Sequence, residues 1–422
     1  MDNPVPPMHG WRMGVDGLRR MEWLGEARVR GYLRLLAALN AVMLVFLLVT
    51  SRGGIDRNGF LVGSDFISFW TAGRMLGGQA SVYDAAAHIA AQRAYFASLE
   101  GYTAFFYPPV FLPFCRPLGL MGYFPALGMW LLATGAFYFD VVRTWWRALP
   151  LQAPVWLVLL AFPAAPIVLT HGQTSFLVAG LLGLGVWLVP RRPVVAGVLL
   201  GLATIKPQLG FLVPLALLLT REWRAIGAAA IAAGVLGGLA SMAFGPQIWL
   251  EWWVASGRAQ DAMASGAVPF GKMVSVFAAM RLVGAPVLIA YAVQAFVSAL
   301  VAGLVIRIAW KRRRFDAALG AVVLAGAPLV TPFVLDYDLV LLAFPMMWLT
   351  AQGLAQGHGS GFRDWEKLAI ACAFVAPAFA RPLALNLHVP IMPLVLGLLL
   401  AAVVRRATET PDAHLQAEPA GA

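Results

Sequence analysis

Residues 193–220 read PVVAGVLLGLATIKPQLGFLVPLALLLT, and Lys206 is the one charged residue in this stretch. Apolar residues on both sides of Lys206-Pro207-Gln208 predict two short helices joined by a turn. Each arm would span about 20 Å at about 1.5 Å per residue, whereas the hydrocarbon core of a membrane is about 30 Å thick. The hairpin would therefore hold Lys206 below the membrane surface. The alternative is one broken helix, which would place the arginines flanking the stretch on opposite sides of the membrane.

A lysine at that depth needs a specific partner. Insertion scales assign a cost of about 2.5–3.5 kcal/mol to a lysine in mid-membrane, and such residues normally face a cavity or an anionic group. We therefore expect Lys206 to contact an anion, with Gln208 lining the same site. Snorkelling of the lysine side chain to the membrane interface is the structural alternative.

The rest of the chain has the composition of a membrane protein. Of its 422 residues, 60% are hydrophobic and 12% are charged, and its mean hydropathy is +0.77. A soluble domain of ordinary composition carries about 25% charged residues. Apolar runs of about 17 to 25 residues recur between arginines, prolines and short polar turns, which is typical of membrane-spanning helices. The sequence leaves no room for a soluble catalytic domain between them.

The net charge of +11 does not indicate nucleic-acid binding. The basic residues lie in short clusters at helix ends, not along one aromatic-studded face. Such clusters are typical of cytoplasmic loops and set the orientation of a membrane protein. If all of them are cytoplasmic, we expect about twelve spans with both termini inside, at 35–50, 122–142, 152–169, 174–190, the two arms of 193–220, 225–244, 285–310, 316–334, 339–353, 367–381 and 390–404.

This topology predicts an all-α polytopic protein of the bacterial inner membrane. A cytoplasmic arm, 1–34, precedes a single transmembrane domain, 35–404, and a cytoplasmic tail follows at 405–422. The first outer loop is 51–121, with amphipathic helices expected in the membrane interface, and the second is 245–284. On this topology the polar turns share the outer, periplasmic face, which brings together Asp65, Tyr107, His171, Gln173, Lys206, Gln208, Asp336 and Asp338.

Four short motifs occur in a characteristic order. GSDFISFWTAGR lies at 63–74, FYPP at 106–109, a Gly-Gln at 172–173 and AGVLLGLATIKP at 196–207. An Asp after the first span, a Tyr-Pro-Pro, a Gly-Gln and this Lys-Pro stretch together resemble glycosyltransferase family 87, over roughly residues 30 to 350. The family contains polyprenol-phosphate-mannose-dependent mannosyltransferases.

The resemblance implies a GT-C-type fold, a catalytic Asp65 in the first outer loop, and a second large outer loop between the seventh and eighth spans. It also implies a polyprenyl-phosphate-linked sugar donor and a lipid or glycan acceptor. Family members carry a Trp-Asp-His-His-like stretch near the tenth span, where this chain has LDYD at 335–338. Mannose is the sugar that the resemblance implies by default, but because that histidine is absent, arabinose, galactose and glucose remain open.

The residue types agree with transfer of a sugar from a lipid phosphate to a hydroxyl. A carboxylate can take the acceptor proton, and cations can stabilise the departing phosphate. One carboxylate and a phosphate leaving group predict inversion at the anomeric carbon, by analogy with glycoside hydrolysis. We predict Asp65 as the general base and Lys206 as the phosphate contact. The other candidates for lining the site are Gln208, Gln173, His171, Tyr107, Arg74, Asp336, Asp338, Arg258 and Lys272.

Several of these side chains have a structural alternative. Asp65 would cap a helix, His171, Gln173 and Gln208 would satisfy helix ends, and Arg74, Arg258 and Lys272 would contact lipid headgroups. The predicted chemistry requires no cofactor. A divalent metal at Asp336 and Asp338 is an alternative, but two carboxylates two residues apart are a weak metal signal.

A transporter or flippase of the same lipid is the second function that this sequence allows. Its intramembrane charges would line a translocation path. A transporter is expected to show related halves and charges distributed through the depth of the bundle. This chain shows no clear internal repeat, and its polar residues gather at one predicted side, which favours the enzyme.

Overall fold

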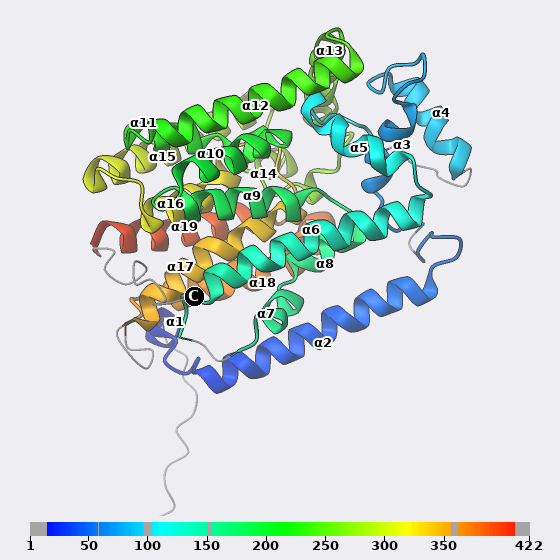
Figure 1. Ribbon diagram of the computed structural model, residues 1–422. Helices are drawn as coiled ribbons and strands as arrows, with labels where there is room; N and C mark the ends of the chain where they lie inside the picture. The colour runs from blue at the N-terminus through cyan, green and yellow to red at the C-terminus, as the bar shows by residue number, and fades with distance from the viewer. Residues whose placement is uncertain (1–14, 58, 97–102, 151–152, 356–360, 410–422) are drawn as a thin grey trace, which may run out of the picture.

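The fold was examined in a computed structural model, which describes residues 15–57, 59–96, 103–150, 153–355 and 361–409. Over these ranges the protein is helical and has three isolated β-bridges but no strand. Figure 1 shows a helical bundle with α3 (Phe66–Met75), α4 (Ala85–Tyr95) and α13 (Ile248–Ser265) at one end. The short helix α1 (Val15–Arg20) lies at the opposite end.

Five of the described helices are long and apolar enough to cross a membrane. Their exposed side chains are mostly large and apolar, as lipid-facing surfaces require. These five helices confirm a polytopic membrane protein, whereas the number of crossings stays a prediction. The five are α2 (Glu26–Thr50), α6 (Tyr123–Trp146), α12 (Trp223–Phe244), α15 (Val287–Arg312) and α18 (Glu366–Leu387).

The other predicted spans also contain helices, but shorter ones. At about 1.5 Å per residue, the 14 residues of α9 cover only about two thirds of a hydrocarbon core that is about 30 Å thick. The turns that join these shorter helices therefore lie within the helical bundle. The short helices are α7 (Val155–Ala161), α8 (Ala164–His171), α9 (Ser175–Leu188), α10 (Pro193–Leu202), α11 (Leu212–Leu219), α16 (Ala317–Gly326), α17 (Ala343–Leu354) and α19 (Met392–Glu409).

Two helices extend beyond the expected ends of the transmembrane domain. Helix α2 begins at Glu26, and a Glu26–Arg30 ion pair of 3.4 Å lies on its first turns. Helix α19 runs to Glu409 because Arg406, which is 2% exposed, is bound by the buried carboxylate of Glu366. The rest of the predicted tail, 410–422, and residues 1–14 of the predicted arm lie outside the described residues.

The predicted first outer loop holds α3, α4 and α5 (Leu112–Gly119). Residues Phe66 to Gly73 of α3 are all buried inside the protein, and the position of α3 at the membrane surface stays a prediction. Gly73 explains the burial, because a Cβ there would lie 2.0 Å from the carbonyl oxygen of Cys115 on α5. The backbones of α3 and α5 are therefore in direct contact, and α3 is enclosed within the protein. The second outer region contains α13, a 3-10 turn (η4, Phe270–Lys272) and α14 (Val276–Leu282).

Glycines also bring α10 against α12. A Cβ at Gly197 would lie 2.2 Å from the carbonyl oxygen of Ala225, and one at Gly201 would lie 2.5 Å from that of Ala229. Residues four apart lie on one helix face, and small residues at this spacing allow close helix packing in membranes. Helix α10 leads directly into the 3-10 turns η2 (Ala203–Ile205) and η3 (Pro207–Gly210), so this packing places the Lys206 turn.

Replacing Gly197 with alanine is expected to destabilise the protein by about 1–3 kcal/mol, the usual cost of overpacking. The new methyl group would meet backbone atoms of α12, which cannot rotate away. Gly234→Ala is the matched control, because nothing lies within 4 Å of a Cβ at that position. Thermal unfolding in detergent should show a lower midpoint for Gly197→Ala alone. Equal midpoints for the two variants would contradict the close contact.

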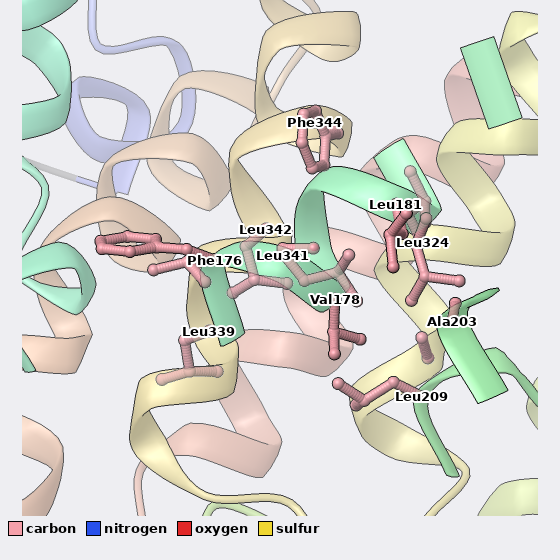
Figure 2. Packing of buried hydrophobic residues seen from close by; sticks show 14 of the residues in the cluster. Phe176, Val178, Leu181, Ala203, Leu209, Leu324, Leu339, Leu341, Leu342 and Phe344 are labelled. Carbon is pink, nitrogen blue, oxygen red and sulfur yellow. The ribbon is translucent and has the colours of Figure 1, made fainter. Parts of the chain in front are cut away.

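An apolar core lies around the Lys206 turn. Figure 2 shows side chains from α9, the flanks of that turn, α16 and the 3-10 helix η6 (Asp336–Leu342) with the first residues of α17 packed together. The labelled side chains are Phe176, Val178, Leu181, Ala203, Leu209, Leu324, Leu339, Leu341, Leu342 and Phe344. Each is at most 7% exposed. Polar side chains next to this core therefore need partners within the protein.

Candidate functional site

The site begins where the first outer loop meets the end of α8. The backbone N–H groups of Gly63 and Asp65 donate to the carbonyl oxygens of Thr170 (2.9 Å) and His171 (3.0 Å). Helix α8 ends at Gly172 in the left-handed conformation with φ 68°, and a Cβ there would lie 2.6 Å from the Cβ of Phe66. Only glycine fits such a turn without strain. These contacts hold Asp65 beside the first residues of α9.

Gln173 orients the Asp65 carboxylate. The Gln173 side chain accepts the Thr174 backbone N–H (2.9 Å) at Oε1. Because a backbone N–H can only donate, this bond fixes the amide orientation, and Nε2 donates to Asp65 Oδ2 at 2.7 Å. Asp65 makes no side-chain cap bond to α3, so the helix-cap alternative is wrong. The second oxygen, Oδ1, has only a long contact of 3.5 Å from the Ser64 hydroxyl.

Tyr107 completes the hydrogen-bond network around Gln173. Its hydroxyl lies 2.9 Å from Gln173 Oε1 and 2.9 Å from the Thr174 hydroxyl. Burial raises the pKa of Tyr107 above its usual value, so the phenol keeps its proton and donates. The Tyr83 hydroxyl in turn donates to the Tyr107 carbonyl oxygen at 2.8 Å. Asp65 itself is half-buried, which leaves its carboxylate accessible.

Lys206 has the anionic partner that the sequence predicts for it. Its ammonium lies 2.5 Å from Asp338 Oδ1, and the two side chains are 5% and 0% exposed. The Ser175 hydroxyl donates to the same oxygen at 2.7 Å. The ammonium also lies 4.8 Å from the ring centroid of Tyr337. Lys206 is therefore buried and paired, and the snorkelling alternative is wrong.

A second, partly buried ion pair joins Asp336 to Arg381, a residue that the sequence analysis missed. Arg381 Nε and one terminal nitrogen donate to the two Asp336 oxygens at 2.7 and 2.9 Å. His171 Nδ1 lies 2.8 Å from the Ile167 carbonyl oxygen, so Nδ1 donates and Nε2 is left as an acceptor 3.4 Å from both terminal nitrogens of Arg381. An arginine 15 residues into an apolar helix, α18, was the signal available in the sequence.

The two pairs and Asp65 form one polar cluster because three consecutive residues at the start of α9 connect Asp65 to the Lys206–Asp338 pair, and η6 connects the two pairs. Gln173 binds Asp65, Thr174 contacts Tyr107, and Ser175 binds Asp338. On the other side, η6 carries Asp336 and Asp338 two residues apart. The polar cluster consists of Asp65, Tyr107, His171, Gln173, Thr174, Ser175, Lys206, Asp336, Tyr337, Asp338 and Arg381.

Four of the predicted residues lie elsewhere or make no bond to the cluster among the described residues. Arg74 stacks over the rings of Trp70 and Tyr95, at 5.1 and 4.5 Å from their centroids. Lys272 lies 5.5 Å from the ring centroid of Phe60. Arg258 is exposed on α13, and Gln208 is half-buried in η3.

The carboxylates of η6 are occupied by protein cations. Asp336 is held by Arg381 and Asp338 by Lys206. Across the part of the chain that the structure describes, no three His, Cys, Asp or Glu side chains are grouped as metal ligands would be. The arrangement of Asp336 and Asp338 is that of two ion pairs side by side.

Comparison with known proteins identifies the family. The model of glycosyltransferase family 87 matches residues 105–335, a stretch that includes Tyr107, Gln173 and Lys206. No curated protein matches the chain, and no solved structure matches it. Because the family match covers more than half of the 422 residues, this protein belongs to glycosyltransferase family 87.

Proposed function

We propose that this glycosyltransferase moves a sugar from a polyprenyl-phosphate donor to a hydroxyl of a lipid or glycan in the outer leaflet. The reaction would take place at the polar cluster, in a GT-C-type fold, on the periplasmic side of a bacterial inner membrane. One observation carries the proposal: a half-buried carboxylate with one unengaged oxygen lies in the same cluster as two cationic side chains. A base and a phosphate site are the two parts that this transfer requires.

Asp65 is the general base of the proposed reaction. Gln173 engages Oδ2, so Oδ1 remains to accept the proton of the acceptor hydroxyl. As that proton leaves, the acceptor oxygen forms a bond to the anomeric carbon, and the bond from that carbon to the phosphate oxygen breaks. The departing lipid phosphate takes both bonding electrons. Attack opposite the phosphate inverts the anomeric carbon.

Lys206 and Arg381 stabilise the departing phosphate. Asp338 takes one of the three donors of the Lys206 ammonium. Asp336 takes Nε and one terminal nitrogen of Arg381, which leaves the other terminal nitrogen facing His171. The Arg381 side chain is 25% exposed, more than that of Lys206, and is therefore the more accessible contact. An oxygen of the phosphate would take the place of His171 Nε2 at this terminal nitrogen of Arg381.

The position of His171 supports placing the acceptor or the sugar at the polar cluster. Its ring lies 5.9 Å from the ring of Tyr337, and Tyr337 belongs to the LDYD stretch that stands where similar proteins carry histidine. An imidazole is thus present beside that position although it comes from a different helix, α8. We infer that His171 contacts the sugar, with mannose as the first donor to test.

The test is transfer by the purified protein in liposomes. Radiolabelled polyprenyl-phosphate mannose is supplied with a lipid extract, and arabinose, galactose and glucose donors are compared in parallel. We expect label in a new product whose glycosidic bond has the anomeric configuration opposite to that of the donor. Movement of the intact donor across the bilayer, without a new product for any sugar, would refute transfer and support a flippase.

A further inference from the structure

A cavity of about 470 Å³ lies between the C-terminal ends of α11 and α15. It lies at the end of the bundle opposite to α3, α4 and α13 (Figure 1). Its walls come from the turn after α11 and the last turn of α15. The lining residues are Leu219, Thr220, Arg221, Ala309, Trp310 and Arg313.

Two arginines give this cavity a positive charge. Arg221 and Arg313 are exposed, and among the described residues no carboxylate pairs with either. Two neighbouring cations have partners within the protein, because Arg312 binds Asp316 at 2.7 Å and Lys311 donates to the Thr408 carbonyl oxygen. Arg221 and Arg313 are the cations in the cavity lining, and they are placed to bind an anion from outside the chain.

Both arginines are held in a conformation that their residue type does not favour. Arg221 has φ 59° and Arg313 has φ 55°, in the left-handed region that glycine and asparagine adopt more easily. Helix ends of this kind usually carry glycine. With arginine at both positions, two arginines line one cavity, and arginine is the residue preferred for phosphate recognition.

The surroundings of the cavity are those of a membrane interface. Trp310 is 71% exposed and Trp223, two residues after Arg221, is 63% exposed. Tryptophan is enriched at the level of lipid headgroups. Next to the cavity, exposed apolar residues continue along the neighbouring helices, among them Leu218 on α11, Ile231 on α12 and Leu300 on α15. A ligand in the cavity would therefore have an apolar surface beside its anionic group.

We propose that this cavity binds the headgroup of a phospholipid of net negative charge, in the leaflet at the end of the bundle opposite to α3, α4 and α13. The two guanidinium groups bind the phosphate, and the acyl chains lie along α11, α12 and α15. Basic pockets between membrane helices bind such headgroups. The proposal needs only the membrane location of the protein and does not depend on the sugar-transfer reaction.

The test compares lipid-dependent stability in nanodiscs. Wild type should unfold at a higher temperature in discs that contain phosphatidylglycerol than in discs of phosphatidylcholine alone, because a ligand that binds only the folded protein stabilises it. The Arg221→Asn/Arg313→Asn variant should lose this difference. Asparagine tolerates positive φ, so in phosphatidylcholine the variant should be at least as stable as wild type, which separates lost lipid binding from misfolding.

The matched control is Arg143→Asn/Arg147→Asn, which removes the same charge from two exposed arginines at the end of α6. It should retain the phosphatidylglycerol effect. An equal loss in both variants would show a diffuse surface charge and overturn the proposal. A second arm adds inorganic phosphate to phosphatidylcholine discs. Stabilisation of wild type by free phosphate to the same extent would also overturn the lipid assignment.

Discussion

Replacing Asp65 with asparagine is expected to lower kcat for sugar transfer by about 10²–10⁴-fold, the range that a general base contributes. Asparagine has the same shape and can still accept the Gln173 amide bond, which is 2.7 Å long in the native protein. It cannot take a proton from the acceptor hydroxyl. The thermal midpoint and the KM for the donor should therefore change little. Initial rates over a range of donor concentrations at saturating acceptor, together with unfolding curves, measure all three quantities.

Asp140→Asn is the control for this variant, since Asp140 is an exposed carboxylate on α6. It should transfer sugar at the wild-type rate. If Asp65→Asn retains wild-type kcat, the base is another group, and the proposed mechanism fails while the family assignment stands. A large fall in the unfolding midpoint would instead assign the Asp65–Gln173 bond a structural role.

Replacing Lys206 with methionine is expected to affect both stability and activity. The change leaves the Asp338 carboxylate, with 0% side-chain exposure, without its cation. Removing one partner of a buried ion pair costs about 3–5 kcal/mol. Transfer should also fall, because the departing phosphate loses a positive charge. Thermal unfolding and donor kinetics of the same preparation separate the two effects.

The double variant Lys206→Met/Asp338→Asn distinguishes the two roles. It removes both charges, so most of the lost stability should return, since neutral replacements of buried pairs are often tolerated. Sugar transfer should stay low because the cation is still missing. Recovery of transfer together with stability would show that Lys206 only neutralises Asp338. Lys311→Met, at an exposed position on α15, controls for the loss of a lysine.

The helical segments could be predicted well because their signals are local. Apolar runs predicted where helices occur and the break at Lys206-Pro207, but not the break that divides the predicted span 152–169 into α7 and α8. Their ends were less accurate, as at Glu26, because charged residues continue a helix once it leaves the apolar region. The short arms of α10 and α11 were also expected, whereas the depth of Lys206 in the membrane stays a prediction from their length.

Partners within the site were harder to predict. The sequence indicated that Lys206 needs an anion and that Asp65, Gln173 and Asp338 share a face. It did not indicate that Asp338 is the anion, because the two residues are 132 positions apart. Arg381 was missed for the same reason, as its partner Asp336 is on another element, 45 positions away. Arg74 was expected at the site but stacks on Trp70 instead.

The sequence by itself determined that the chain is a helical membrane protein with a buried lysine turn and one candidate base, because hydrophobicity, turn residues and helix length act over neighbouring residues. Only the tertiary structure decided which charges meet. Close approach at Gly73 and Gly197 sets how α3 and α10 pack, and that packing places Asp65 and Lys206. Such contacts depend on the shapes of distant helices, so no local pattern specifies them.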